Sequence, residues 1–230
     1  AGMSDPRSLS ERLAKLPPGR HLLPPDYVSQ NQRERILLAT ATLVAERGYQ
    51  KTTIELIAKT ARVALSTFYE HFEDKESCFL AAFEESVEAA REIFSDLVDP
   101  QLSWPQQIAT GLEVLLEMVV KEPERAKLCL VEAQAAGSAS LARYQAMLES
   151  VAAKLREGRA LNPRGASLPE GLEVGIAGGL AWLIHQRLTA DRPEGLEALL
   201  PEMLQVTLTP YVGQSAAGQA AAEAEARRAA

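Results

Sequence analysis

The chain has 230 residues, of which 47% are hydrophobic and 24% charged, and this is the composition of a globular protein with a sizeable core. No apolar run approaches the ~20 residues that a membrane-spanning helix needs, and no segment resembles a secretory signal. We therefore expect a cytoplasmic protein without a membrane partner. The formal net charge of −7 is not the basic balance usual for proteins that bind nucleic acid through bulk charge.

Two cysteines and three histidines are too dispersed to suggest catalytic or metal chemistry. Cys78 and Cys129 are far apart, with no CxxC spacing and no neighbouring histidine, which indicates two free, buried thiols. A redox pair, or a metal site that includes His185, is the alternative. The sequence contains no phosphate-binding loop, dinucleotide fingerprint or hydrolase motif. We therefore expect no cofactor, no metal and no enzymatic activity.

Prolines interrupt the first part of the chain, at Pro17-Pro18 and at Pro24-Pro25. Proline disfavours helix in the residues around it, so residues 1–29 are expected to form a flexible N-terminal arm. The arm contains four cations, Arg7, Arg12, Lys15 and Arg20. Such an arm can reach into a DNA minor groove, but a tail that is free or packs on its own domain is the alternative.

The first predicted helix covers residues 31–47 and is amphipathic. Its inner stripe consists of Ile36, Leu37, Leu43 and Val44, and Gly48 is suited to end it. We expect this helix to support the segment that follows.

Residues 52–72 have the spacing of two short helices joined by a tight turn. One face of the first helix would bury Ile54, Ile57, Ala58 and Ala61, and the second would bury Val63, Phe68 and Phe72. The second helix then presents a different set outward, namely Leu65, Ser66, Thr67, Tyr69 and His71. Hydroxyl, phenol and imidazole groups suit phosphates and base edges, so the pattern predicts a helix-turn-helix DNA reader. An ordinary pair of packed helices is the alternative.

The same stretch resembles the DNA-binding domain of the tetracycline-repressor (TetR) family over about residues 31–80. The family pattern T-[TV]-x-x-I-A-x-x-A-G-V-S-x-x-T-x-Y-x-H-F-x-x-K-E is matched at Thr52, Thr53, Ile57, Ala58, Ala61, Val63, Thr67, Tyr69, His71, Phe72, Lys75 and Glu76. The resemblance implies a DNA-binding domain over residues 30–77. It also implies that DNA is contacted by Thr52, Thr53, Leu65, Ser66, Thr67, Tyr69, His71 and Lys75.

Two residues of the turn depart from the family pattern. Arg62 replaces the usual glycine, so it must either adopt a left-handed conformation at a cost of roughly 1 kcal/mol or reshape the turn. Ala64 replaces the usual serine and removes a helix N-cap worth about 1 kcal/mol.

A fourth helix is expected from Asp74, which is suited to cap it, to about Val98. Lys75 at its start resembles a family residue that touches a DNA phosphate, whereas a solvated surface cation is the alternative. Residues 31–77 contain seven cations and seven anions, and residues 78–230 contain 13 and 21. The acidity therefore lies away from the predicted DNA surface, mostly beyond a Debye length of about 8 Å.

The remainder of the chain is expected to be helical, at about residues 104–121, 123–136, 139–157, 169–190 and 194–212. Pro201 should kink or split the last of these helices. The predicted fold class is all-α, with an N-terminal helix-turn-helix domain and a helical ligand-binding and dimerisation domain over residues 78–213. An alanine-rich tail, residues 214–230, is expected to be disordered or a frayed helix.

The helix near residues 169–190 contains Gly171, Gly175, Gly178 and Gly179, which each cost up to roughly 1 kcal/mol relative to alanine. Close helix packing would compensate. The family resemblance implies a homodimer formed by the last two helices, and the residues we expect at this interface are Gly175, Ile176, Gly179, Leu180, Leu183, Leu196, Leu200 and Met203. Packing within one chain is the alternative.

A ligand pocket is expected among the middle helices, for an apolar or amphipathic small molecule. The candidate lining residues are Trp104, Met118, Cys129, Glu132, Tyr144, Met147, Trp182 and His185, each of which could equally be core or surface. The combined prediction is a repressor that a small-molecule effector releases from a near-palindromic double-stranded DNA operator. A small all-helical enzyme or a helical interaction module without DNA binding is the alternative.

Overall fold

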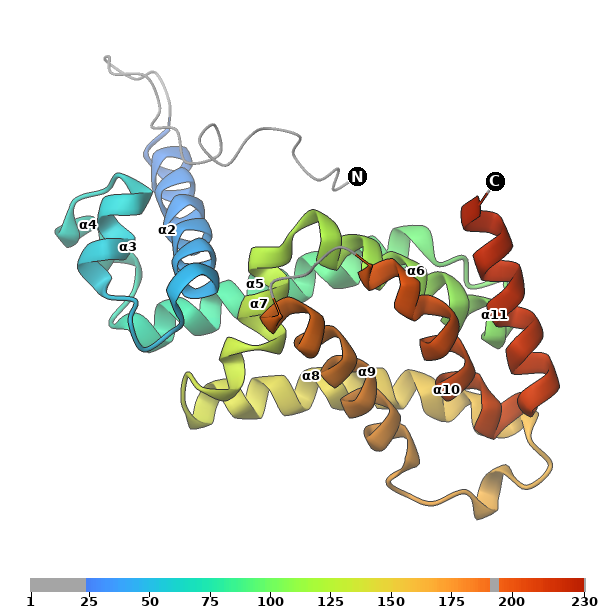
Figure 1. Cartoon of the computed structure of the whole chain (residues 1–230). Helices are drawn as coiled ribbons and strands as arrows, with labels where there is room; N and C mark the ends of the chain where they lie inside the picture. The colour runs from blue at the N-terminus through green and yellow to red at the C-terminus, as the bar shows by residue number, and fades with distance from the viewer. Residues whose placement is uncertain (1–23, 191–194, 230) are drawn as a thin grey trace.

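The computed structural model describes residues 24–190 and 195–229, and its regular elements are all helical (Figure 1). The N-terminal helices are α2 (Pro25–Arg47), α3 (Ile54–Ala61), α4 (Leu65–His71) and α5 (Lys75–Leu97). The C-terminal helices are α6 (Trp104–Lys121), α7 (Pro123–Leu130), α8 (Ser138–Arg156), α9 (Leu172–Thr189), α10 (Leu200–Val212) and α11 (Gln214–Ala229). Short 3-10 turns are η1 (Glu132–Gln134), η2 (Glu157–Leu161), η3 (Gly165–Ser167) and η4 (Leu196–Leu199). The all-α prediction is confirmed, and among the described helices none could cross a membrane.

Helices α2, α3 and α4 form a small head at one end of the molecule (Figure 1). Ile57, Ala61 and Phe68 have no exposed surface, and Phe72 is also buried. These are the residues that the sequence periodicity placed inward. The hydrophobic side chains of two short helices are therefore buried together against α2, and this fixes which sides of α3 and α4 face solvent.

Helix α2 begins six residues earlier than the sequence predicted. Pro25 occupies its first turn, where proline fits because its fixed φ is helical and its missing N–H would have no partner there. The predicted arm is therefore wrong for residues 25–29. Residues 1–23 lie outside the described part of the chain, so the remaining arm prediction is untested.

Helix α5 is shared by the head and the rest of the molecule (Figure 1). The predicted cap is confirmed, because the Asp74 carboxylate accepts from the Ser77 N–H at 2.7 Å and the Ser77 hydroxyl accepts from the Asp74 N–H at 3.2 Å. Its first turns bury Cys78, Phe79 and Phe83 against the head core. The head is thus rigidly continuous with a helix that extends beyond it.

The alanine-rich tail is helix α11 and not a disordered segment. It packs along α10, with Ala217, Ala221 and Ala224 buried at helical spacing. Arg227 near its end pairs with Glu113 of α6 at 2.8 Å. Alanine has the highest helix propensity and its small side chain allows close helix contact, which explains order in a segment with few large hydrophobic residues.

Other helix ends differ from the predictions by a few residues. The predicted helix 123–136 ends as α7 at Leu130 and continues as η1, and α9 starts at Leu172, three residues after Pro169. Pro201 lies in the first turn of α10, directly after η4, so the predicted split at this proline is confirmed.

A buried ion pair joins α9 to α10 and to the loop before α9. Arg159 donates to both carboxylate oxygens of Glu173, at 2.7 and 2.8 Å, and Tyr211 donates to the same carboxylate at 3.1 Å. The Glu173 side chain has no exposed surface, and the hydrogen bonds from Arg159 lower its pKa. Arg159 also donates to the carbonyls of Gly165, Leu168 and Pro169. These contacts fix the position of α9 in the bundle.

Candidate nucleic-acid interface and ligand pocket

The turn between α3 and α4 is tight and left-handed at one residue. Arg62 has φ 56° and ψ 43°, and its N–H donates to the Lys59 carbonyl at 3.1 Å. The Val63 N–H donates to the Ala58 carbonyl at 3.0 Å. Arg62 therefore adopts the left-handed conformation usual for glycine and does not reshape the turn.

A second arginine, which belongs to α2, contacts this turn. Arg35 of α2 is buried, and its guanidinium donates to the Ala61 carbonyl at 2.8 Å and to Asn31 Oδ1 at 3.1 Å. Burial, and then the charge of Arg62, lower the pKa of Arg35. The buried guanidinium satisfies the C-terminal end of α3 and so fixes the angle at which α4 leaves the turn.

The outward side of α4 carries the side chains predicted to read DNA, which we call the α4 strip: Leu65, Ser66, Thr67, Tyr69 and His71. Leu65 is 43% exposed and Tyr69 54% exposed, Ser66 is exposed, and Thr67 and His71 are half-buried. The Tyr69 ring rests edge-on against buried Phe68, with 5.6 Å between centroids. A rigid aromatic base therefore holds a strip of donors and acceptors toward solvent. Ala64 gives α4 no side-chain cap, as predicted.

The two threonines before α3 have different roles. Thr53 is exposed and caps α3, since its hydroxyl accepts from the Leu56 N–H at 3.3 Å. Thr52 is buried, and its hydroxyl donates to the Gly48 carbonyl at 2.9 Å. The structure thus corrects the inclusion of Thr52 among the DNA contacts, because its side chain is directed into the head.

His71 is held in a partly apolar position. Its Nε2 is buried and makes no hydrogen bond with any described residue, and its ring lies against Phe72 with centroids 6.3 Å apart. Burial lowers the pKa of His71. At neutral pH the side chain is therefore an uncharged imidazole, which cannot attract phosphate as a cation would.

The ammonium group of Lys75 is bonded within the head, so Lys75 is not the solvated surface cation that was the alternative. Its ammonium donates to the carbonyls of Tyr49 and Thr52, both at 3.0 Å, and lies 4.0 Å from the centre of the Tyr49 ring. Burial lowers the pKa of Lys75. Two of its three N–H donors are thus used on the loop that leads into α3, which leaves one for a phosphate.

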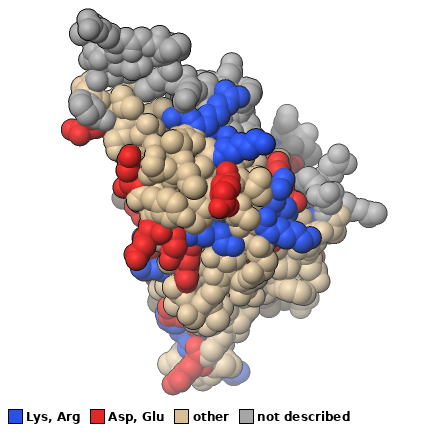
Figure 2. Space-filling model, turned by 90° about the vertical axis from the view of Figure 1, so that its left-hand side faces the viewer, with Lys and Arg blue, Asp and Glu red and all other residues tan. Residues whose placement is uncertain are grey.

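Charge on the head is mixed. Figure 2 shows Lys and Arg side chains beside Asp and Glu on the face that carries α3 and α4, with uncharged surface between them. Within the described part of the chain, exposed Lys51, Lys59 and Arg62 form no ion pair, so their charges are available to phosphates. This distribution agrees with the balanced count of seven cations and seven anions in residues 31–77.

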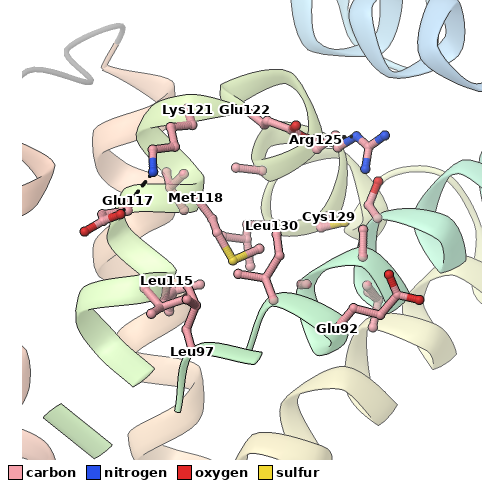
Figure 3. Close-up of a pocket in the computed structure, with 18 of the residues that line it drawn as sticks. Glu92, Leu97, Leu115, Glu117, Met118, Lys121, Glu122, Arg125, Cys129 and Leu130 are labelled. Atoms are coloured by element: carbon pink, nitrogen blue, oxygen red, sulfur yellow. Dashed lines mark hydrogen bonds and ion pairs between the residues drawn. The ribbon is translucent and has the colours of Figure 1, made fainter. Parts of the chain in front are cut away.

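A cavity of about 540 Å³ lies among α5, α6 and α7, with Met147 of α8 at its wall (Figure 3). Its lining is mainly apolar, and Met118, Cys129 and Leu130 point into it. Three predicted lining residues are present there, namely Met118, Cys129 and Met147. Burial raises the pKa of the Cys129 thiol to about 12, so this thiol is protonated and inert.

The other five predicted lining residues lie elsewhere. Trp104 is buried against Tyr211 and donates to the Lys154 carbonyl, and Tyr144 is half-buried against the core. Glu132 accepts from the Tyr49 N–H of the head. Trp182 is 56% exposed and stacks on His185, whose Nδ1 lies 3.1 Å from the Leu130 carbonyl. The prediction relied on aromatic, histidine and acidic side chains, whereas Ala, Val, Leu and Ile make up half of the pocket lining.

The predicted dimer residues divide between two sides of α9 and α10. Gly175 and Gly179 are exposed and Leu183 is half-buried. The other five are buried inside the chain and cannot meet a partner directly: Ile176, Leu180, Leu196, Leu200 and Met203. The outer side, which we call the α9 face, consists of exposed Val174, Gly175, Gly179 and Trp182 and of half-buried Gly178.

A helix-turn-helix head on an all-helical body with a half-open pocket is the architecture of DNA-binding transcriptional regulators. Residues 36–82, which include most of α2, all of α3 and α4 and the first turns of α5, match the model for bacterial regulatory proteins of the tetR family. The predicted resemblance of the head to DNA-binding domains of the tetR family is thereby confirmed.

Similar proteins extend the likeness to the whole fold. The HTH-type transcriptional regulator YhgD of Bacillus subtilis (strain 168) is 28% identical over 90 residues, which are 39% of this chain and 47% of YhgD. The chain thus aligns with about half the length of this relative. The fatty acid degradation regulator FadR from Bacillus halodurans has a TM-score of 0.67 at 20% identity, covering 77% of this chain and 94% of that one.

FadR from Bacillus subtilis, solved in complex with stearoyl-CoA, has a TM-score of 0.62 at 19% identity, covering 76% of this chain and 97% of that one. At this level of identity the two FadR structures show a shared fold, and stearoyl-CoA is a ligand of the Bacillus subtilis protein.

Proposed function

We propose that this protein is a homodimeric repressor whose two heads bind a near-palindromic operator and are released by a small molecule. The observation that carries the proposal is the α4 strip. The hydroxyl groups of Ser66, Thr67 and Tyr69 lie on the outward side of α4, opposite buried Phe68, and Arg62, which forms no ion pair with a described residue, stands in the turn before the helix. This is the arrangement that a recognition helix needs to lie in a major groove.

The α9 face supports the dimer. A side-chain carbon added at Gly175, Gly178 or Gly179 would meet no described atom within 4 Å, so packing within the chain does not require these glycines. Each costs up to roughly 1 kcal/mol in a helix, and close approach of a second chain offsets that cost. Exposed Trp182 and Val174 add apolar surface to this face.

The pocket supports an effector that is apolar or amphipathic, and its charges favour a neutral or cationic molecule. The lining contains four carboxylates, Glu92, Asp96, Glu117 and Glu122, and two cations. Lys121 pairs with Glu117 at 3.1 Å and Arg125 with Glu122 at 3.0 Å, so neither cation is left for an anionic ligand. Stearoyl-CoA, the ligand of one FadR structure, is highly anionic and would meet an excess of negative charge here.

The DNA part is tested by selecting fragments from the region that flanks the protein's own gene and measuring their affinity by mobility shift. We expect one fragment to bind at least about a thousandfold more tightly than random DNA. Footprinting should show two half-sites with centres about one helical turn, roughly 34–36 Å, apart. Binding to all fragments with equal affinity would contradict the proposal.

The effector part is tested by thermal unfolding with dodecyltrimethylammonium chloride and with dodecanoyl-CoA below their micelle concentrations. We expect the cationic amphiphile to raise the unfolding midpoint and the acyl-CoA to leave it unchanged. The variant Glu92→Gln should weaken the effect of the cation, whereas Glu88→Gln, one turn earlier on α5 and outside the lining, should not. A larger shift with the acyl-CoA would contradict the proposed ligand class.

A further inference from the structure

The loop between α2 and α3, residues 48–53, is held by charged groups from outside the head. It determines where α3 begins, because Thr53 at its end is the N-cap of α3. Lys75 of α5 donates to two of its carbonyls, those of Tyr49 and Thr52. Two carbonyls of the loop thus accept from a cation, and one N–H of the loop donates to a residue from another part of the chain.

That donor is the Tyr49 N–H, which bonds to Glu132 Oε2 at 2.8 Å. Glu132 belongs to η1, beyond α7, and is 83 residues away in sequence. A second hydrogen bond joins the same two segments, since Gln50 Nε2 donates to the Ala135 carbonyl at 3.3 Å. A carboxylate that accepts from a backbone N–H makes a stronger bond than a neutral acceptor. Glu132 is therefore the principal polar link from η1 to this loop.

The link lies next to the pocket. Cys129 and Leu130, the last residues of α7, line the cavity, and Glu132 follows Leu130 by two residues. The Leu130 carbonyl is itself fixed by His185 of α9 at 3.1 Å. The end of α7 therefore touches the cavity and α9, and η1, which follows it, touches the head loop.

We infer that Glu132 is a positioning residue for DNA reading: its carboxylate orders the loop that sets α3, and through the turn at Arg62 it sets the α4 strip. The inference rests on the proposed function only in that DNA affinity is its readout. Without the carboxylate, the loop samples more conformations, and DNA must order it on binding. The loop then loses conformational entropy when DNA binds, and this loss weakens DNA affinity. With Glu132 present, the loop is already ordered before DNA binds.

The experiment measures the affinity of the wild type, Glu132→Ala and Glu132→Gln for one DNA fragment that the wild type selects. The matched control is Gln134→Ala, which alters an exposed residue of the same turn. We expect Glu132→Ala to bind DNA about tenfold more weakly, in line with losing one hydrogen bond to a charged group. Glu132→Gln keeps a carbonyl acceptor and should stay within about threefold of wild type, and the control should match wild type. Circular dichroism at the assay temperature establishes that each variant is folded.

Hydrogen exchange of the Tyr49 amide gives a readout that does not depend on DNA. We expect exchange to be about tenfold faster or more in Glu132→Ala and close to wild type in Gln134→Ala. Equal DNA affinity in folded Glu132→Ala and wild type would overturn the inference, as would equal exchange at Tyr49. Tighter binding by Glu132→Ala would overturn it too, because the link would then hold the head away from its DNA-binding position. A wild type that selects no DNA contradicts the proposed function, and in that case the exchange measurement still decides whether Glu132 orders the loop.

Discussion

The α4 strip and the α9 face are two helical surfaces that the other described residues leave uncovered, and they differ in chemistry. The α4 strip offers hydroxyl, phenol and imidazole groups above two buried phenylalanines. The α9 face offers three glycines beside Trp182 and Val174. Polar groups on a rigid base suit a hydrated partner rich in acceptors, whereas glycines suit another helix that approaches closely.

The difference shows that exposure alone does not identify the partner of a surface. On α4 the side chains would contact the partner, and they cover the helix backbone. On α9 the missing side chains matter, because a Cβ at Gly175, Gly178 or Gly179 would have room within the single chain. Changes to the two surfaces should therefore affect different equilibria, and the following experiments separate them.

The largest effect should come from a bulky charge on the α9 face. Gly179→Arg places a cation where we propose that two helices meet, and burying an unpaired charge is costly. We expect light scattering to give twice the chain mass of 24.9 kDa for the wild type and a single chain mass for the variant at micromolar concentration.

Gly218→Arg is the control for this experiment, since Gly218 of α11 also has open space around it and lies off the α9 face. Its mass should equal that of the wild type. A monomeric wild type, or a Gly179→Arg variant that stays dimeric, would remove the proposed role of this face.

The next largest effect should follow removal of the most exposed aromatic side chain of the α4 strip. Tyr69→Ala should weaken binding of the selected DNA about ten- to a hundredfold, measured by fluorescence anisotropy at fixed salt. Tyr27→Ala on α2 is a matched control, because both tyrosines are 54% exposed. If both variants lose affinity equally, or neither does, the α4 strip is not the reading surface.

Relief of the left-handed turn before α4 should stabilise the head modestly. Arg62→Gly should raise the free energy of unfolding by about 1 kcal/mol, because glycine has no Cβ to disfavour φ 56°. Arg62→Ala keeps a Cβ and should show no such gain. Urea denaturation measures both variants, and equal stability of the two would show that the backbone is not strained there.

A serine at the start of α4 should raise the free energy of unfolding by a similar or smaller amount. Ala64 is the N-cap residue and provides no acceptor, so Ala64→Ser should add about 0.5–1 kcal/mol to the free energy of unfolding. Ala64→Val changes the same position without adding an acceptor. A gain for valine as well would assign the effect to packing and not to capping.

The smallest effect concerns His71 and pH. Because burial lowers its pKa in the folded state, the unfolded chain takes up the proton first as pH falls. Stability should therefore decline slightly below the ordinary histidine pKa of about 6.5 and continue to decline down to the folded-state pKa. His71→Gln should flatten the unfolding midpoint between pH 7 and pH 5, and an unchanged slope would mean that another group titrates.

The head could be predicted from sequence because its signals are local. The apolar spacing of α3 and α4, the stop at Gly48 and the cap at Asp74 depend only on residues a few positions apart. Even in the head, the sequence does not show which of two neighbouring residues is buried. Thr52 and Thr53 look alike in sequence, yet one is buried and the other exposed.

The rest of the molecule depends on contacts distant in sequence. Helix α9 has apolar residues on both sides, such as Ile176 inward and Val174 outward, so its spacing does not indicate which side faces solvent. Helix α11 is ordered by burying alanines, which give almost no hydrophobic pattern. Glu132 accepts from a backbone N–H that is 83 residues away, and a pattern of side chains in the sequence does not predict a backbone partner.

The unbroken course of α5 has a mechanical consequence. Its 23 residues correspond to a rod about 34 Å long, with the head core at one end and the cavity wall at the other. A swing of about 10° around one end displaces the other by about 6 Å, a shift comparable to one helical turn of protein. In the dimer that we propose, a swing of this size in each α5 would change the distance between the two α4 strips by more than the rise of one base pair step, about 3.4 Å.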